Sequence, residues 1–171
     1  GPNTVSGTIA LTAGSLDIDE DSSISGAIVQ GGSATIDVVQ GKTLSYSGAA
    51  LSLGPNTLTL AGAGTLSNVN ALVLENETSV LKISGTNTIS GPVSLNAGLV
   101  DADESSILSG DLTLGGPASI DVAQNKTLKY GGADLEIGAY LLTLRGGGVL
   151  SSTNALKLNE IGGLVQLDGI N

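Results

Sequence analysis

The chain contains no cysteine, histidine, methionine, phenylalanine or tryptophan, and only 2% of its 171 residues are aromatic. The absence of cysteine excludes a disulfide framework and thiolate metal sites. Without cysteine or histidine, the usual zinc sites, histidine general bases and serine–histidine or cysteine–histidine nucleophile pairs are also excluded. The sequence therefore predicts no cofactor and no catalytic residues, and we expect that the protein is not an enzyme.

Positive charge is also scarce, since six lysines and arginines face sixteen acidic residues and give a net charge of −10. This balance argues against binding to nucleic acid or to anionic membranes, because both carry negative charge. No apolar run is long enough to span a bilayer, so membrane insertion is not expected. What the chain does contain is glycine, at 26 positions, and aliphatic residues, which make up nearly all of its 40% hydrophobic content.

The organisation of the chain is a tandem repeat, which self-comparison reveals without gaps. The segment 3–7 recurs at 87–91, an offset of 84 residues, and the segment 41–46 recurs at 125–130. We therefore expect one continuous rod made of a first repeat at 3–86 and a second repeat at 87–171. Residues 1–2, Gly-Pro, resemble the remnant of a protease-cleavage site left by recombinant expression.

Each repeat contains four shorter units of about 21 residues, in which aliphatic residues mostly lie two apart, the period of a strand. Glycine, asparagine, serine and proline fill the junctions between these short runs. We align the aliphatic residues of each repeat in three columns, and the first column begins Val5, Ile24, Leu44 and Leu66. Three short strands per unit, repeated eight times, predict an all-β, right-handed parallel β-helix (β-solenoid) of about eight coils without significant helix. At a ladder spacing of roughly 4.8 Å, eight coils form a rod of about 38 Å.

The scarcity of aromatic residues fits a narrow interior that stacked leucine, isoleucine and valine fill. Tyr46 and Tyr130 occupy equivalent positions in the two repeats. We expect each ring to pack over the surface of its coil, because a bulky ring would distort a narrow interior. The two tyrosines lie four coils apart, about 19 Å, so they cannot grip one sugar ring together.

The densest acidic cluster is Asp17-Ile18-Asp19-Glu20-Asp21, and the second repeat echoes it. It resembles the start of an EF-hand loop, but Ser22 stands where that loop needs glycine and Ile28 where it needs glutamate. The cluster predicts either a solvated acidic corner or a weak calcium site, because closely spaced carboxylates repel unless a cation lies between them. The calcium candidates are Asp17, Asp19, Glu20, Asp21, Asp101, Asp103 and Glu104.

A regular array of exposed hydroxyls on neighbouring coils would indicate a binding face. The column Thr4, Ser23, Thr43 and Thr65 has this form, but its second-repeat equivalents include Ile107 and Val149. Residues at outward positions match better at the offset of 84 than between adjacent coils. This pattern favours a spacer over a face that binds a ligand with repeated groups, because such a face should present the same exposed residues on adjacent coils.

The glycine-, serine-, threonine- and asparagine-rich coils at 41–48 and 64–74 resemble the β-solenoid stalks of large bacterial surface adhesins. Filamentous-haemagglutinin-like adhesins and autotransporter passenger domains are the groups concerned. The resemblance extends over nearly the whole chain after Pro2 and rests on repeat texture. It implies an extracellular or cell-surface stalk that holds an adhesive tip away from the cell.

We therefore expect a structural spacer from a longer, secreted fibrous protein. Its partners would be neighbouring repeats of the same chain, and its uncapped ends could stack end to end between molecules. The alternative is a module that binds carbohydrate or a host or partner protein through a side face. A polysaccharide-active β-helix enzyme is the third candidate, and the chain offers few aromatic or basic residues for it.

Overall fold

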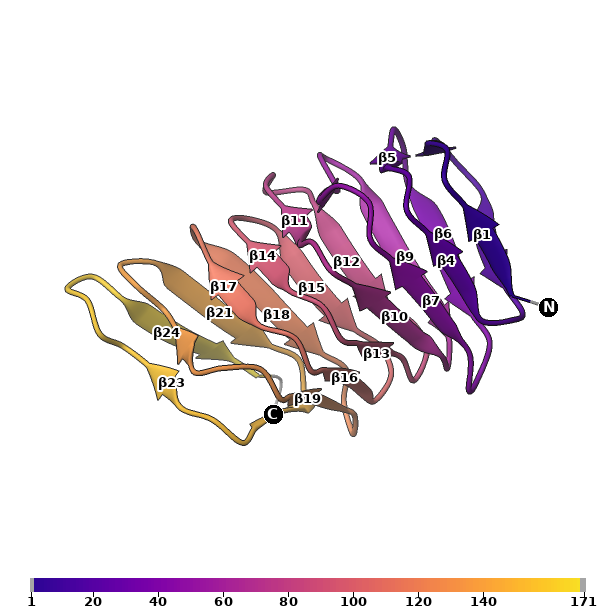
Figure 1. Cartoon of the computed structure of the whole chain (residues 1–171). Helices are drawn as coiled ribbons and strands as arrows, with labels where there is room; N and C mark the ends of the chain where they lie inside the picture. The colour runs from indigo at the N-terminus through magenta and orange to yellow at the C-terminus, as the bar shows by residue number, and fades with distance from the viewer. Residues whose placement is uncertain (1, 170–171) are drawn as a thin grey trace.

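The computed structural model describes residues 2–169 and shows a parallel β-solenoid of eight coils (Figure 1). Gly1 of the presumed cleavage remnant and the last two residues of the second repeat, 170–171, lie outside the described residues. Within 2–169 all regular structure is β-strand, as predicted. This part of the chain accordingly holds no helix that could cross a membrane.

Each coil contributes one strand to each of three sides, and every strand pair is parallel. The first sheet is continuous from end to end and consists of β1 (Asn3–Val5), β4 (Ser22–Ile24), β7 (Thr43–Tyr46), β10 (Thr65–Asn68), β13 (Thr88–Ile89), β16 (Ser106–Leu108), β19 (Thr127–Tyr130) and β22 (Val149–Ser152). The third sheet is equally continuous and consists of β3 (Ser15–Ile18), β6 (Ala34–Val38), β9 (Thr57–Gly62), β12 (Val80–Ile83), β15 (Leu99–Ala102), β18 (Ala118–Val122), β21 (Leu141–Arg145) and β24 (Leu164–Asp168).

The second side is broken into three pieces, which interrupt pairing between β5 and β8 and between β17 and β20. Its strands are β2 (Ile9–Leu11) and β5 (Ile28–Gln30), then β8 (Leu51–Ser52), β11 (Leu72–Leu74), β14 (Val93–Leu95) and β17 (Leu112–Leu114), and finally β20 (Leu135–Glu136) and β23 (Leu156–Lys157). The two breaks occur at equivalent places in the two repeats.

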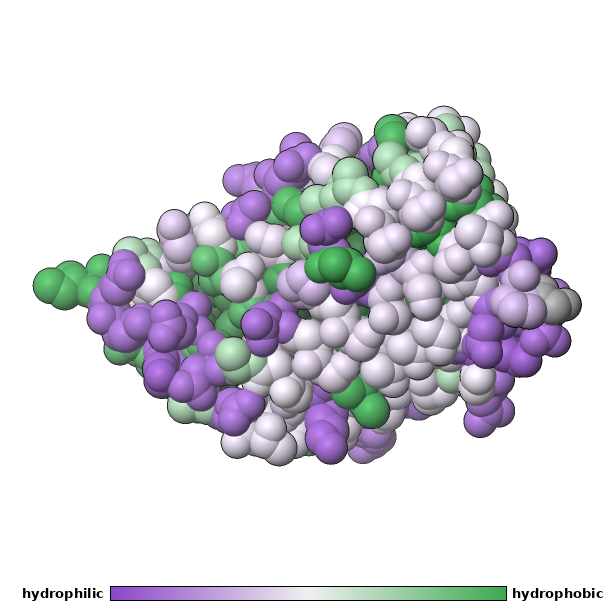
Figure 2. Space-filling view, in the orientation of Figure 1, coloured by the Kyte–Doolittle hydropathy of each residue, from purple (hydrophilic) through white to green (hydrophobic). Residues whose placement is uncertain are grey.

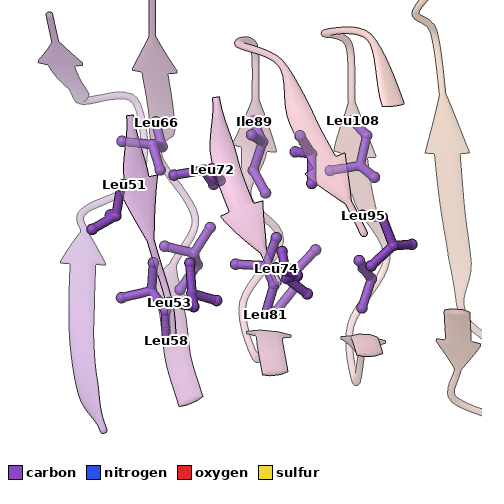
Figure 3. Packing of buried hydrophobic residues seen from close by; sticks show 14 of the residues in the cluster. Leu51, Leu53, Leu58, Leu66, Leu72, Leu74, Leu81, Ile89, Leu95 and Leu108 are labelled. Atoms are coloured by element: carbon purple, nitrogen blue, oxygen red, sulfur yellow. The ribbon is translucent and has the colours of Figure 1, made fainter. Parts of the chain in front are cut away.

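Stacked aliphatic side chains fill the interior, as the sequence predicts (Figure 3). Leu72 lies beside Leu51 on one side and Val93 on the other, and Leu81 lies between Leu58 and Val100. All of these side chains are at most 2% exposed. The paired strands of the second side therefore confirm the alignment made from sequence. The third column needs a correction of two residues at two steps, because the structure places Ile36 opposite Leu60 where the sequence aligned it with Leu58, and Ile120 opposite Leu144 where the sequence aligned it with Leu142.

The first column needs a correction of two residues. The structure places Ile24 opposite Tyr46, and Leu44 lies opposite Ser22. Leu44 and Tyr46 are both apolar and two residues apart, so either can point inward from the same strand. The sequence could not choose between these registers, and the prediction that the Tyr46 ring packs over the surface is wrong.

Tyr46 and Tyr130 are in fact part of the interior, with exposures of only 1% and 2%. The hydroxyl of Tyr46 accepts a hydrogen bond from the Ile28 amide at 3.1 Å and donates one to the Ala49 carbonyl at 2.5 Å. Tyr130 accepts the equivalent bond from the Leu112 amide at 3.2 Å. Both amides begin a strand, β5 or β17, that has no ladder partner in the next coil. At each break in the second side, the tyrosine hydroxyl thus accepts the hydrogen bond of a strand amide that has no ladder partner in the next coil.

This burial predicts that the protein loses stability in alkali. Burial raises the pKa of Tyr130 above its usual value of 10.0. The unfolded chain therefore releases this proton as the pH rises through about 10, whereas the folded chain retains it. The free energy of unfolding is unaffected by Tyr130 below that pH and falls above it. Urea unfolding below and above pH 10 measures the loss, and Tyr130→Phe should flatten it. An equally steep loss in that variant would contradict this assignment.

Candidate functional site

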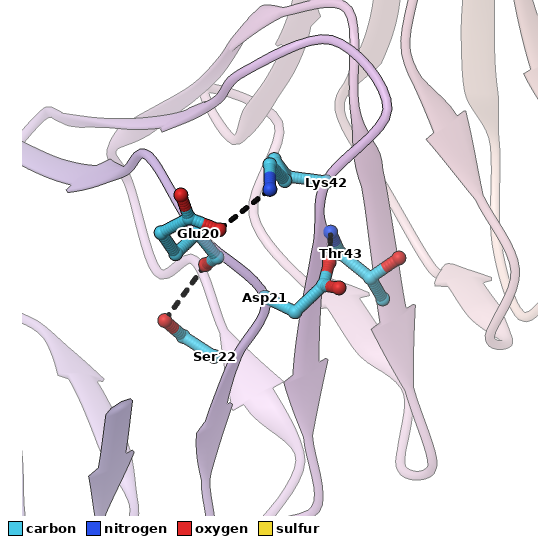
Figure 4. Close-up of polar contacts among 5 residues, drawn as sticks. All are labelled: Glu20, Asp21, Ser22, Lys42 and Thr43. Carbon is cyan, nitrogen blue, oxygen red and sulfur yellow. Dashed lines mark hydrogen bonds and ion pairs between the residues drawn. The ribbon is translucent and has the colours of Figure 1, made fainter. Parts of the chain in front are cut away.

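The acidic cluster of the first repeat lies at the corner between β3 and β4, next to the following coil (Figure 4). Asp17 points outward from β3, opposite Asp37 of β6, and Asp19 is exposed. Glu20 forms an ion pair with Lys42 at 2.5 Å. Asp21 Oδ1 accepts a hydrogen bond from the Thr43 amide at 2.8 Å. Two of the acidic side chains are therefore already engaged by the next coil.

The second repeat reproduces this arrangement with one addition. Glu104 pairs with Lys126 at 2.5 Å, in the same way as Glu20 with Lys42. Lys82 reaches from the preceding coil and contacts both Asp101, at 3.0 Å, and Asp103, at 2.5 Å. Its Nζ thus occupies the position between two carboxylates in which a metal cation would neutralise them.

The shifts in pKa reflect these contacts. The hydrogen bond with Lys42 lowers the pKa of the Glu20 carboxyl, and the same contact raises the pKa of Lys42. Hydrogen bonds to Asp103 and then to Asp101 raise the pKa of Lys82. Each of these pairs is partly open to solvent, so screening makes its contribution to stability small.

The acidic corners do not assemble a complete set of metal ligands. Among residues 2–169, no three acidic side chains come together in a group that could hold a metal ion. The outward column of the third sheet places Asp17 opposite Asp37, and Asp101 between Lys82 and Asp121, so its carboxylates are spread over successive coils. Calcium binding at the seven acidic candidates stays a prediction, and the lysines are the cations that the structure places there.

We expect millimolar calcium to leave the midpoint of thermal unfolding unchanged relative to EDTA. Lys42, Lys82 and Lys126 already pair with Glu20, Asp101, Asp103 and Glu104, so a divalent ion would have to displace them. Circular dichroism melts in both buffers test this expectation. A midpoint that rises with calcium would identify a metal site, since a ligand that binds only the folded state raises its stability.

A second candidate surface is the outer face of the first sheet, which we call the hydroxyl face. The corrected register places Ser23 between Thr4 and Ser45, and Ser45 beside Ser67. We call such a row of side chains, one from each successive coil, a file. Ser90 and Ser109 continue this file, because their amides donate to the carbonyls of Leu66 and Ile89 in the preceding coils. A second file runs through Thr43, Thr65 and Thr88. The pale area over the first sheet in Figure 2 corresponds to this face.

The sequence alignment missed the hydroxyl face because it placed Ser23 beside Thr43. With Ser45 in that position, exposed or half-exposed hydroxyls occupy one file on six consecutive coils. The second file ends differently, since Ile107 and Lys129 follow Thr88. Outward residues on adjacent coils are thus more alike than the sequence indicated, at least on this face.

The first file carries no acidic side chain, although the chain as a whole has a net charge of −10, whereas Asp21 lies beside Thr43 at the start of the second file. Hydroxyls at ladder spacing can donate to and accept from a ligand with repeated polar groups. The two files of this face lack the aromatic platforms on which sugar rings stack. Comparison of the chain with models of known protein families, with curated proteins and with solved structures found no match to any of them.

Proposed function

We propose that the chain is a stalk or spacer segment of a long extracellular or cell-surface fibrous protein, of the kind found in bacterial adhesins. The observation that supports it best is the continuity of the first and third sheets through both repeats. At the junction, Leu66 pairs with Ile89 and Leu81 with Val100, and all four side chains are at most 3% exposed. The contact between the two repeats is thus packed in the same way as the contacts between coils within a repeat. We therefore expect the junction to be as rigid as the rest of the rod.

The surface also suits a spacer. Lysines link successive coils at the acidic corners, and net negative charge opposes lateral bundling of rods. The interior is narrow and aliphatic, and the coils differ little in length. The proposal therefore needs no ligand and no chemistry on this segment, which agrees with the absence of a catalytic constellation in the sequence.

Distance measurement across the junction tests the proposed rigidity. The chain has no cysteine, so Thr43→Cys with Ser151→Cys gives one defined pair of spin labels. These two positions belong to one file that passes through Thr65, Thr88, Ile107 and Lys129. Five steps correspond to roughly 24 Å between the backbones.

We expect a single narrow distance distribution from that pair. Thr4→Cys with Ser67→Cys, three steps apart within the first repeat, is the matched control. If the pair across the junction gives a much broader distribution than the control, the two repeats move independently. That result would contradict a rigid spacer.

The hydroxyl face supports a second candidate function, a module that binds carbohydrate through its side. The supporting observation is the file of six hydroxyls on consecutive coils. Ser45→Glu places a charge in the middle of this file, and Thr113→Glu makes the same kind of change on the second side. In binding assays on polysaccharides, loss of binding with Ser45→Glu alone would favour this function. Absence of binding in the unmodified chain would remove it.

A further inference from the structure

An open pocket of about 240 Å³ lies on the outer face of the third sheet, across the first residues of β18 and β21. Ser119 and Thr143, which are neighbours in the ladder between these strands, both line it. They take outward positions, next to the inward Ile120 and Leu142, yet only 7% and 8% of their surface is exposed. The residues that line the pocket come from coils four to seven, so neither end of the chain takes part.

Two side chains of opposite charge border this pocket. Arg145, at the end of β21, donates a hydrogen bond from Nη2 to Ser119 Oγ at 2.5 Å. Glu77 lies at the corner between β11 and β12 and lines the pocket from there. Among residues 2–169 neither of these two side chains forms an ion pair. Both charged groups are thus available to a ligand.

The corner that carries Glu77 is held by the coils on both of its sides. The Ser79 amide donates to the Asn76 carbonyl at 2.8 Å and closes a turn around Glu77. Ser79 Oγ donates to the Gly54 carbonyl of the preceding coil. Gly98 of the following coil lies so close that a Cβ atom there would be 2.4 Å from the Ser79 carbonyl oxygen. The backbone of Glu77 is therefore fixed relative to the pocket.

The first repeat has different residues at the equivalent positions. Ala61 stands where the second repeat has Arg145, and a threonine stands where it has Leu141, which lines the pocket. Thr59, the equivalent of Thr143, is more exposed than Thr143. The arginine and the apolar surface are therefore additions in the second repeat, and the coil does not need them in order to fold.

The charges around the pocket favour a ligand without net charge. Asp121 and Asp168 flank Arg145 in the outward column of the third sheet, and Glu77 borders the pocket, so an anion would be repelled. The Arg145 guanidinium already takes the place between these acids where a cation would bind. The guanidinium donates hydrogen bonds, the carboxylate accepts them, and the two hydroxyls do both. Adjacent hydroxyls of a sugar ring present the matching set of donors and acceptors.

We propose that this pocket binds one uncharged sugar residue. Arg145 donates to the ring hydroxyls, Glu77 accepts from them, and the Ser119 and Thr143 hydroxyls complete the set. The apolar residues of the pocket contact the ring itself, as in other small-ligand sites that combine an apolar lining with a few placed polar groups. The pocket lies on the third sheet, so the proposal rests neither on the spacer function nor on the hydroxyl face of the first sheet.

Titration of simple glycosides into the isotope-labelled chain, followed by amide chemical shifts, tests the proposal. The probes are the methyl glycosides of glucose, galactose and mannose. We expect at least one of them to cause saturable shifts at Ser119, Thr143 and the corner 75–79. If all three leave these amides unchanged, or if sodium sulfate or methylammonium chloride shifts them instead, the pocket is not a site for a neutral sugar. Shifts confined to the strands of the first sheet would also contradict the proposal.

Variants identify the groups that bind. Arg145→Ala is expected to fold, since the first repeat has Ala61 at the equivalent position, and to weaken binding about tenfold or more, because hydrogen bonds to charged groups are the strong ones. Thr143→Val removes one hydroxyl at nearly the same volume, and we expect it to weaken binding several-fold. Thr59→Val makes the same change in the first repeat and should leave binding unaltered. Unaltered binding by Arg145→Ala, or equal effects of the two valine variants, would overturn the assignment.

Discussion

Gly110→Ala is expected to lower the free energy of unfolding by about 3 kcal/mol or more, the upper range for overpacking a well-packed site. Gly110 stands at the corner that follows β16, directly against the preceding coil. A Cβ atom there would lie 2.1 Å from the Gly91 carbonyl oxygen and 2.3 Å from its carbon. Both atoms belong to backbone that the ladders hold at fixed spacing, so neither coil can yield alone.

Gly131 provides the control for this substitution. It lies at the corresponding corner of the next coil, and a Cβ atom there would meet nothing nearer than 3.7 Å. Gly131→Ala should therefore change stability by less than about 1 kcal/mol, with some gain from a less flexible unfolded chain. Denaturant unfolding of both variants measures the difference. Similar losses in the two would show that close contact between coils at this corner is not what requires glycine.

Tyr46→Phe is expected to destabilise the protein by about 2 kcal/mol, although it removes a single oxygen atom. The hydroxyl satisfies the buried Ile28 amide and the Ala49 carbonyl at the break between β5 and β8. A buried group left without its partner costs about 1–3 kcal/mol. The phenylalanine ring would still fill the interior, so the loss reports the hydrogen bonds and not the packing.

Tyr140→Phe is the matched control, because the Tyr140 side chain is 36% exposed and water can replace its contacts. We expect a change within about 0.5 kcal/mol for it. Combining Tyr46→Phe with Tyr130→Phe should add the two losses, since the residues are several coils apart. If Tyr46→Phe proves no more harmful than Tyr140→Phe in thermal or urea unfolding, the proposed bridging role of the hydroxyl is wrong.

The fold was predictable because its signal is repeated. The pairs Leu58–Leu81 and Leu51–Leu72 recur at the offset of 84 as Leu142–Val165 and Leu135–Leu156, and these pairings could be predicted without the structure. The position of Tyr46 was not predictable in this way. Its burial depends on Gly48, where a Cβ atom would lie 2.6 Å from the tyrosine ring, and on a break in the second side. Neither feature is visible from an alternation of apolar and polar residues.

The candidate sites show the same division. The outward position of Asp17 and the exposure of Asp19 follow from strand alternation, and the structure agrees. The partner of Asp101 and Asp103 is Lys82, a residue about twenty positions away whose approach depends on register. The hydroxyl face was missed for the same reason, because one shift of two residues moved Ser45 into the file. Predicting a contact between coils therefore requires the register of the paired strands, which the alternation of apolar and polar residues does not determine.

Amide hydrogen exchange resolved by residue tests the central claim, that the two repeats form one continuous stack of coils. Stability in such a stack passes between neighbours, so the central coils should be the most protected and the end coils the least. We predict that the slowest amides lie in β10 through β16, on both sides of the junction at residues 84–88. Two protected blocks separated by fast exchange at that junction would show two independent units and would contradict the claim.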